Sequence, residues 1–206
     1  MSSPIPEVFA DIAFPASGQA LPLNHGYPLF SALSRLIPRL HSEAGWGVHP
    51  VLGVRDGRNL ALEHRSRVKV RMPLSEISTV MPLAGASVQV AGATVMLGFP
   101  QVFPLMPAAH LKARLVTIKG FLEEEEFVAA LRRQLGQLEE LADDSETIEV
   151  VVGARRILKI RDKQVVGFAV GLTGLRADAS LAIQRHGLGG RRHMGAGIFV
   201  PPGRQG

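Results

Sequence analysis

The 206-residue chain carries a formal net charge of +5, contains no cysteine, and has a hydrophobic content of 46%. That apolar content excludes a disordered chain, the length accommodates one large domain or two small ones, and the lack of cysteine excludes disulfides, thiolate zinc sites and cysteine nucleophiles. The positive charge favours a polyanionic partner, nucleic acid above all, and the cytoplasm is the expected location.

The first half is predicted to begin with a strand, a helix and a second strand. Residues 7–14 are strand-like, and a turn at 24–27 leads into a helix in which Pro28 suits the first position. The apolar stripe of this helix recurs at helical spacing and comprises Leu29, Leu33, Leu36, Ile37 and Leu40. Residues 48–54 are a candidate strand.

Residues 65–72 form the clearest predicted strand. Its period of two places one set of residues, Arg65, Arg67, Lys69 and Arg71, on one face and Val68, Val70 and Met72 on the other. Adjacent cations repel one another unless an anion lies over them, so this row predicts a track for phosphates. The alternative is a solvated outer face whose cations prevent edge-to-edge pairing.

Residues 77–109 contain no formally charged residue, which raises the question of a membrane span. Proline and glycine divide this stretch so often that no run of about twenty apolar residues remains. Short strands around a Gly92 turn fit better. The chain start also lacks the charged region and apolar core of a signal peptide, so no membrane contact is expected.

The second half is predicted to repeat the order of the first. The predicted elements are strands at 111–118, 147–152, 156–160 and 165–172, with a turn at Gly153, and helices at 123–141 and 176–184. Each half then approximates strand, helix, strand, strand, helix, strand, which is the ferredoxin-like order. The predicted fold is therefore α+β, with two tandem ferredoxin-like (RRM-like) domains at residues 1–108 and 109–206.

A glycine-rich loop precedes the expected last strand. Two Gly-apolar-Gly triplets, 187–189 and 195–197, flank five residues that include Arg191, Arg192 and His193. Glycine lets the backbone approach a ligand closely, and exposed amides together with cations suit an anion. The loop lacks the Gly-Lys-Ser/Thr ending of a Walker loop and the strand-and-helix context of a dinucleotide fingerprint. It is predicted to bind an anion such as phosphate rather than to be a flexible hairpin.

This loop pattern, with basic residues inside it and a strand after it, resembles that of the CRISPR-associated RAMP superfamily. More narrowly, the chain resembles the repeat-processing endoribonucleases of that group, and residues 11–15 and 21–27 are similar to the start of the Myxococcus-type variety. The resemblance implies a metal-independent endoribonuclease without cofactors that binds CRISPR repeat RNA and cuts precursor transcripts. Attack by a 2′-hydroxyl would leave a 2′,3′-cyclic phosphate. Retention of the mature guide RNA and association with other effector subunits are also implied.

Such a reaction needs a base for the 2′-hydroxyl, an acid for the leaving 5′-oxygen and cations for the phosphorane. His41 is expected near the C-terminal end of the first helix, where the dipole favours a protonated ring. It also matches by position the histidine that many of these nucleases use. His25 and Tyr27 precede that helix and are the expected assisting residues if their loop folds back.

The expected RNA contacts are the basic strand and the glycine-rich loop with its flank, namely Arg65, Arg67, Lys69, Arg71, Arg185, Gly189, Gly190, Arg191, Arg192 and His193. Few aromatic residues are present, 5%, so recognition of backbone and shape is expected rather than base stacking. A zinc site at His25, His41 and His49 matches no local ligand motif. The main alternative function is a non-catalytic RAMP subunit that binds guide RNA.

Overall fold

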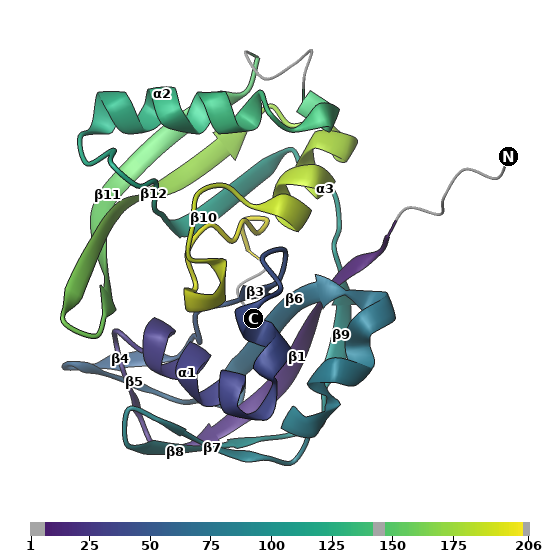
Figure 1. The fold of residues 1–206 in the computed structure, drawn as a ribbon, viewed down its shortest axis with the longest axis vertical. Coiled ribbons are helices and arrows are strands. Elements are labelled where there is room, and N and C mark those ends of the chain that lie inside the picture. Colours follow the sequence, from purple (N-terminus) through teal and green to yellow (C-terminus); the bar gives the residue numbers. More distant parts are fainter. Residues whose placement is uncertain (1–6, 142–146, 204–206) are drawn as a thin grey trace, which may run out of the picture.

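The computed structural model describes residues 7–141 and 147–203. It is a mixed α+β protein in which two groups of antiparallel strands, one from each half of the chain, lie one above the other (Figure 1). The segment after α3 (Ala177–His186) returns between the two halves, so the last described residues, up to 203, lie near the centre of the molecule. No described helix is long and apolar enough to cross a membrane.

The first half is built around its long N-terminal strand. Its strands are β1 (Phe9–Gly18), β2 (Leu21–Pro22), β3 (Gly47–Val48), β4 (Val54–Asp56), β5 (Asn59–Ala61), β6 (Arg67–Pro73), β7 (Ser87–Val90), β8 (Ala93–Leu97) and β9 (Gln101–Pro104). Its helices are α1 (Gly26–Leu36) and the 3₁₀ helices η1 (Pro38–His41) and η2 (Leu74–Leu83). β1 pairs with β6 on one edge and with β9 and β8 on the other.

The period of two predicted for the basic strand is confirmed over β6. Val68, Val70 and Met72 are fully buried in the core of the first half, where they pack with apolar residues of β1 and α1. The basic residues alternate with them and face the second half. One side of the sheet is thus a core and the other is turned toward the rest of the protein.

The second half is smaller and has its own core. Its strands are β10 (His110–Val116), β11 (Glu149–Ile160) and β12 (Lys163–Thr173), paired in the order β10-β12-β11, and its helices are α2 (Glu124–Leu135), η3 (Glu139–Leu141), α3 and η4 (Arg192–Met194). Lys112 and Val200 form an antiparallel bridge that places the end of the chain beside β10. The turn of the β11–β12 hairpin reaches α1 of the first half (Figure 1).

Several predicted elements differ in the structure. The strand expected at 48–54 is wrong, because only its first residue belongs to β3 and its last to β4, while the rest is irregular. The turn expected at Gly153 is also wrong. β11 continues through that residue with a register shift between Val152 and Arg155, so a β-bulge takes up the irregularity. The helix expected at 123–141 ends at Leu135, and its last turn is replaced by η3.

Candidate nucleic-acid interface

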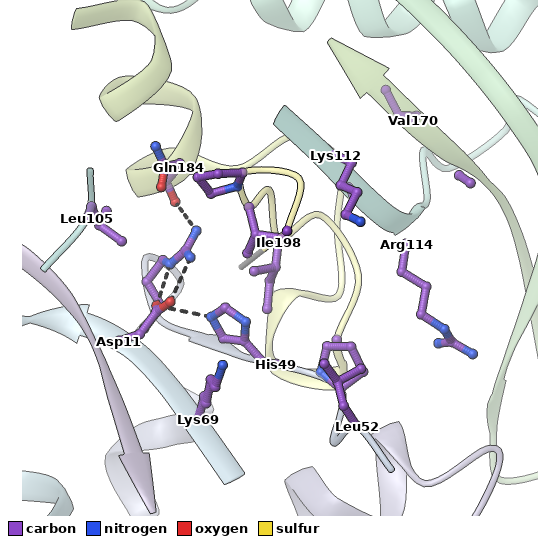
Figure 2. Close-up of a pocket in the computed structure, with 18 of the residues that line it drawn as sticks. Asp11, His49, Leu52, Lys69, Leu105, Lys112, Arg114, Val170, Gln184 and Ile198 are labelled. Carbon is purple, nitrogen blue, oxygen red and sulfur yellow. Dashed lines mark hydrogen bonds and ion pairs between the residues drawn. The ribbon is translucent and has the colours of Figure 1, made fainter. Parts of the chain in front are cut away.

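A basic cleft of about 910 Å³ lies between the two halves. Its cationic lining residues are Arg65, Arg67, Lys69 and Arg71 of the first half and Lys112, Arg114 and Arg156 of the second. Figure 2 shows Lys112 and Arg114 extending from β10 into the space bordered by Lys69 and His49. The only carboxylate among the lining residues that the structure describes is Asp11. The cleft is therefore suited to a polyanion that contacts both halves at once.

The cations of this cleft lie close enough to affect one another. Burial and the charges of Arg67 and Arg71 lower the pKa of Lys69, although Asp11 acts in the opposite direction. Desolvation and the charge of Arg156 lower the pKa of Arg114 in the same way. Mutual repulsion of this kind is relieved when an anion binds between the charges. The electrostatics of the cleft thus favour occupation by phosphates.

At the base of the cleft, Arg71 holds the two halves together. Only 1% of its surface is exposed, and it donates from Nε to Asp11 Oδ1 at 2.7 Å and from Nη2 to Asp11 Oδ2 at 3.0 Å. Nη1 donates to the carbonyl oxygens of Gln184 at 2.9 Å and Phe199 at 2.7 Å, both in the second half. His49 Nε2 donates to Asp11 Oδ1 at 3.0 Å. We call Asp11, His49 and Arg71 the interdomain clasp.

The charges of the clasp are mutually balanced. Burial by itself raises the pKa of Asp11, but the charges and hydrogen bonds of His49 and Arg71 outweigh it and hold the pKa well below its usual range. Burial lowers the pKa of His49 more than Asp11 raises it. Arg71 was predicted as an RNA contact; its guanidinium is buried, and all three of its nitrogens donate to protein atoms.

The glycine-rich loop is held by close backbone contacts between its two triplets. Gly187 and Gly197 both have positive φ, +65° and +68°, which favours glycine. A Cβ on Gly187 would lie 2.3 Å from the carbonyl oxygen of Gly197, and one on Gly197 would lie 2.4 Å from that of Leu188. The spacing of the glycines therefore reflects the crossing of two backbone segments.

Most amides of this loop are not available to a ligand, contrary to the expectation of an amide-lined phosphate site. Residues 189, 190, 194, 195, 196 and 197 all donate their backbone N–H groups within the protein. Gly189 donates to Gln134 Oε1 at 2.7 Å and Gly190 to the Thr117 carbonyl at 2.8 Å. The loop can present side chains to RNA, but these amides are already satisfied.

The basic residues of the loop have different environments. Arg191 is exposed, whereas Arg192 is buried and donates to the carbonyl oxygens of His186 at 2.7 Å and Arg185 at 2.8 Å at the end of α3. Burial and the nearby Arg71 lower the pKa of Arg192 to about 10. The side chain of Arg185 pairs with Glu140. Arg192 therefore caps a helix, and Arg191 is the loop arginine that solvent can reach.

His25 occupies a structural position. Its Nδ1 donates to the Pro22 carbonyl at 2.9 Å, and its Nε2 accepts a hydrogen bond from the Val51 amide at 3.0 Å. Burial lowers its pKa, so the ring is neutral near pH 7 with its only proton and its only lone pair both engaged. His25 was predicted to assist catalysis, but proton transfer would require breaking one of these bonds.

His41 and His193 lie on the same aromatic ring, that of Phe30 on α1. The His41 ring meets it edge-on with centroids 4.8 Å apart, and the His193 ring stacks on it with centroids 5.6 Å apart. His41 is exposed at the end of η1, and His193 is half-buried on η4 of the glycine-rich loop. The structure thus brings together two histidines that are far apart in the sequence.

Tyr27 lies one turn before Phe30 and contacts the second half. Its hydroxyl accepts a hydrogen bond from Arg161 Nε at 2.8 Å, and the guanidinium carbon lies 5.8 Å from the ring centroid. This hydrogen bond raises the pKa of Arg161 and fixes a cation beside the phenol. His25, His41 and His49 have separate partners, and no three His, Cys, Asp or Glu side chains in residues 7–141 and 147–203 gather as a metal site would require.

Sequence reasoning missed the cleft residues Lys112, Arg114 and Arg156. Lys112 and Arg114 share the period of two that identified the first basic strand, so the signal was present in the sequence. Their value as ligand contacts depends on facing β6 across the cleft, which only the relative placement of the two halves establishes.

The chain was compared with known proteins. Residues 10–204 match the family model described as Cas6 Crispr. The CRISPR-associated endonuclease Cas6 of Myxococcus xanthus strain DK1622 is 45% identical over 197 residues, covering 96% of this chain and 83% of that protein.

Solved structures with a similar fold have much lower sequence identity. A CRISPR-associated protein Cas6 superimposes with a TM-score of 0.66 at 15% identity, covering 94% of this chain and 98% of the other. The product of a Cas6-related gene from Pyrococcus furiosus superimposes with a TM-score of 0.66 at 12% identity, covering 97% of this chain and 100% of the other. Thermus thermophilus Cse3 bound to an RNA representing a pre-cleavage complex superimposes with a TM-score of 0.51 at 16% identity, covering 94% of this chain and 98% of the other. These likenesses concern the fold.

Proposed function

The chain belongs to the Cas6 CRISPR family, and from that premise we propose that it is an endoribonuclease that binds CRISPR repeat RNA and cuts precursor transcripts into guide RNAs. The basic cleft is the observation that supports RNA binding, because both halves contribute cations to it. Asp11, the only carboxylate among the described lining residues, is paired with Arg71 and His49. The relative from Myxococcus xanthus, 45% identical, carries the name of an endonuclease.

The proposed RNA contacts are the exposed or half-exposed cations of the two halves. Arg65, Arg67 and Lys69 would hold phosphates on one wall of the cleft, opposite Lys112, Arg114 and Arg156. From the glycine-rich loop and its flank, Arg191 and Arg185 would contribute further charge. Gly189 and Gly190 would act indirectly, by holding the loop against Thr117 and Gln134. Arg71 and Arg192 would act indirectly, through the clasp and through the end of α3.

The proposed chemistry is attack of a 2′-hydroxyl on the adjacent phosphate, with the 5′-oxygen as leaving group. This reaction is proposed to be metal-independent, because protein groups can supply the acid, the base and the cations. We assign His41 as a catalytic residue, since it is exposed and lies beside the glycine-rich loop. Tyr27 with Arg161 is a candidate for orienting the scissile phosphate, whereas His25 would support the start of α1.

We also propose that each half is a ferredoxin-like domain, with a boundary near residue 108. Pairing in the first half follows the order β9-β1-β6-β3, and in the second Val200-β10-β12-β11, which are equivalent arrangements. The 3₁₀ helix η2 would stand where the second helix of the first unit is expected. The RNA would then lie between two such units, and the protein would retain the guide RNA and join other effector subunits after cleavage.

The cleft can be tested with one substitution from each wall. In an Arg67→Ala, Arg114→Ala variant, two phosphate contacts are lost and fewer counterions are released on binding. We expect weaker binding of repeat RNA and a plot of log K against log salt flatter by about 1.4, at roughly 0.7 per contact for single strands. Binding of repeat RNA and of a scrambled RNA of equal length, measured across a salt series, checks this.

Arg133→Ala is the matched control for the cleft variant. Arg133 lies on α2 with its guanidinium over Phe121, outside the residues that line the cleft, and its removal lowers the net charge by one unit. Its salt dependence should equal that of the wild type. An equal loss in the control variant, or a wild type that neither prefers nor cuts repeat RNA, would contradict the proposed function.

A further inference from the structure

We propose that His193 is the second proton-transfer residue of the cleavage reaction, acting as the base for the 2′-hydroxyl while His41 acts as the acid for the 5′-oxygen. This inference rests on the proposed function and adds to it a catalytic residue within the glycine-rich loop. The sequence suggested that His193 only touches RNA and that His25 or Tyr27 assists His41. Four features of the structure favour His193 instead: its placement, its tautomer, its electrostatic environment and the rigidity of its loop.

The placement of the two histidines suits a reaction at one phosphate. Both rings contact the Phe30 ring, which is itself buried, and so they are held by one rigid side chain. His41 arrives from η1 in the first half and His193 from η4 in the second, with α1 between them. RNA that follows the junction of α1 and the glycine-rich loop would meet both imidazoles.

The tautomer of His193 is determined by its hydrogen bond. Nε2 lies 2.8 Å from the Glu43 carbonyl oxygen, which can only accept, so Nε2 carries the proton. In a neutral ring Nδ1 then has a lone pair, and it accepts no hydrogen bond from the residues that the structure describes. A half-buried imidazole with a fixed proton on one nitrogen and an unused lone pair on the other is arranged as a base.

The charges around His193 keep it in the neutral form that a base requires. Burial, followed by the positive charges of Arg192 on its own loop and His41 on η1, lowers its pKa, although the Glu43 carbonyl acts in the opposite direction. On the side of α1, the His193 ring packs against the Phe30 ring, which carries no charge. His193 is therefore available as a base at neutral pH, whereas His25 has neither a free proton nor a free lone pair.

The loop that carries His193 is held on both sides. Within the loop, the Met194 amide donates to the Arg191 carbonyl at 2.9 Å, and toward the first half a Cβ on Gly26 would lie 2.4 Å from the Met194 carbonyl oxygen. The glycine at the start of α1 thus allows the loop to lie directly against that helix. Such contacts restrict the position of the imidazole, which proton transfer requires.

The proton transfers balance as follows. His193 Nδ1 takes the proton of the 2′-hydroxyl, a bond forms between the 2′-oxygen and phosphorus, and the bond from phosphorus to the 5′-oxygen breaks. His41 gives its proton to the departing 5′-oxygen. The products are a 2′,3′-cyclic phosphate and a 5′-hydroxyl, with His193 protonated and His41 neutral until solvent restores them.

Single-turnover cleavage with saturating protein separates the two roles. His193→Ala and His193→Gln should both slow cutting by roughly 10²-fold or more, with repeat affinity unchanged. Glutamine can still donate to the Glu43 carbonyl. Slow cutting by His193→Gln would therefore be due to the missing base and not to a loosened loop. A substrate with sulfur in place of the scissile 5′-oxygen should restore cutting by His41→Ala, because that leaving group needs no acid, but not by the His193 variants.

The pH dependence gives a second readout. Because a base works only when neutral and an acid only when protonated, the wild-type rate should rise with pH through the pKa of His193 and fall again at higher pH. The low-pH limb should vanish in His193→Gln. His110→Ala, an exposed histidine outside the site, should match the wild type. Wild-type rates for both His193 variants, or rescue of both by the sulfur substrate, would overturn the assignment while leaving the proposed function intact. Failure of the wild type to cut repeat RNA would instead overturn the proposed function.

Discussion

Replacing His41 with alanine should slow single-turnover cleavage of repeat RNA by about 10²- to 10⁴-fold, the range for loss of one general acid–base group. The affinity for the repeat should stay unchanged, because the His41 ring packs edge-on against Phe30 and lies outside the basic cleft. Cleavage rates at saturating protein, together with equilibrium binding to an uncleavable RNA, separate the two effects.

The control for this variant is another exposed histidine on the first half. His64 does not line the basic cleft. Its backbone carbonyl accepts a hydrogen bond from Arg67 Nη1 at 2.7 Å, and its side chain has no hydrogen bond to the residues that the structure describes. His64→Ala should cut at the wild-type rate. If His41→Ala cuts as fast as His64→Ala, proton transfer does not depend on His41, and the junction of α1 and the glycine-rich loop is not the active site.

Replacing Arg71 with methionine should cost about 3–5 kcal/mol of stability, because it leaves the buried Asp11 carboxylate without its bidentate partner. Two buried carbonyl oxygens, of Gln184 and Phe199, would also lose their donor. For a chain of this length each kcal/mol corresponds to about 2–4 °C, so Tm should fall by roughly 10 °C. Thermal and urea unfolding of the free protein measure this directly.

The double variant Asp11→Asn, Arg71→Met tests the reason for that loss. Removing the charge of Asp11 as well as that of Arg71 takes away the uncompensated carboxylate, so much of the stability should return. Arg67 lies four residues before Arg71 on the same face of β6, lines the cleft and is partly exposed. Arg67→Met should therefore change stability by under about 1 kcal/mol. A double variant as unstable as Arg71→Met would show that the loss of stability comes from the carbonyl contacts to the second half and not from the charge pair within the first.

The alternation in β6 shows which properties of a strand can be predicted from sequence periodicity and which cannot. Alternation correctly predicted which residues of this strand face the core, since a period of two is a property of the extended backbone. It could not distinguish Arg67, which borders the basic cleft, from Arg71, which is sealed by Asp11 and by two carbonyls of the second half. That distinction depends on residues 60, 113 and 128 positions away in the chain.

The glycine-rich loop illustrates the same limit. Its glycines correctly marked a place where the backbone must pass close to another segment, but the segment is the loop itself together with α1. Arg191 and Arg192 are adjacent in the sequence and were predicted to have the same role. The left-handed conformation of Arg191 turns the chain so that Arg192 points inward to the end of α3.

The candidate active site was predicted in part. His41 was placed correctly beside the first helix, although it ends a 3₁₀ helix after α1 instead of α1 itself. His25 is near in sequence, but both of its ring nitrogens are engaged by Pro22 and Val51, and we therefore propose His193 in its place. His193 could not be paired with His41 from the sequence, because their proximity arises only when the second half returns its C-terminal loop to α1.

The most direct test of the account is cleavage of a CRISPR repeat RNA by the purified protein in excess EDTA, beside a copy that lacks the 2′-hydroxyl at the ribose preceding the cut. We predict that the all-ribose RNA is cut to a 2′,3′-cyclic phosphate and a 5′-hydroxyl, and that the deoxy copy is bound equally well but not cut. Cutting of the deoxy copy, or loss of all cutting in EDTA, would contradict a reaction driven by the 2′-hydroxyl and by protein side chains alone.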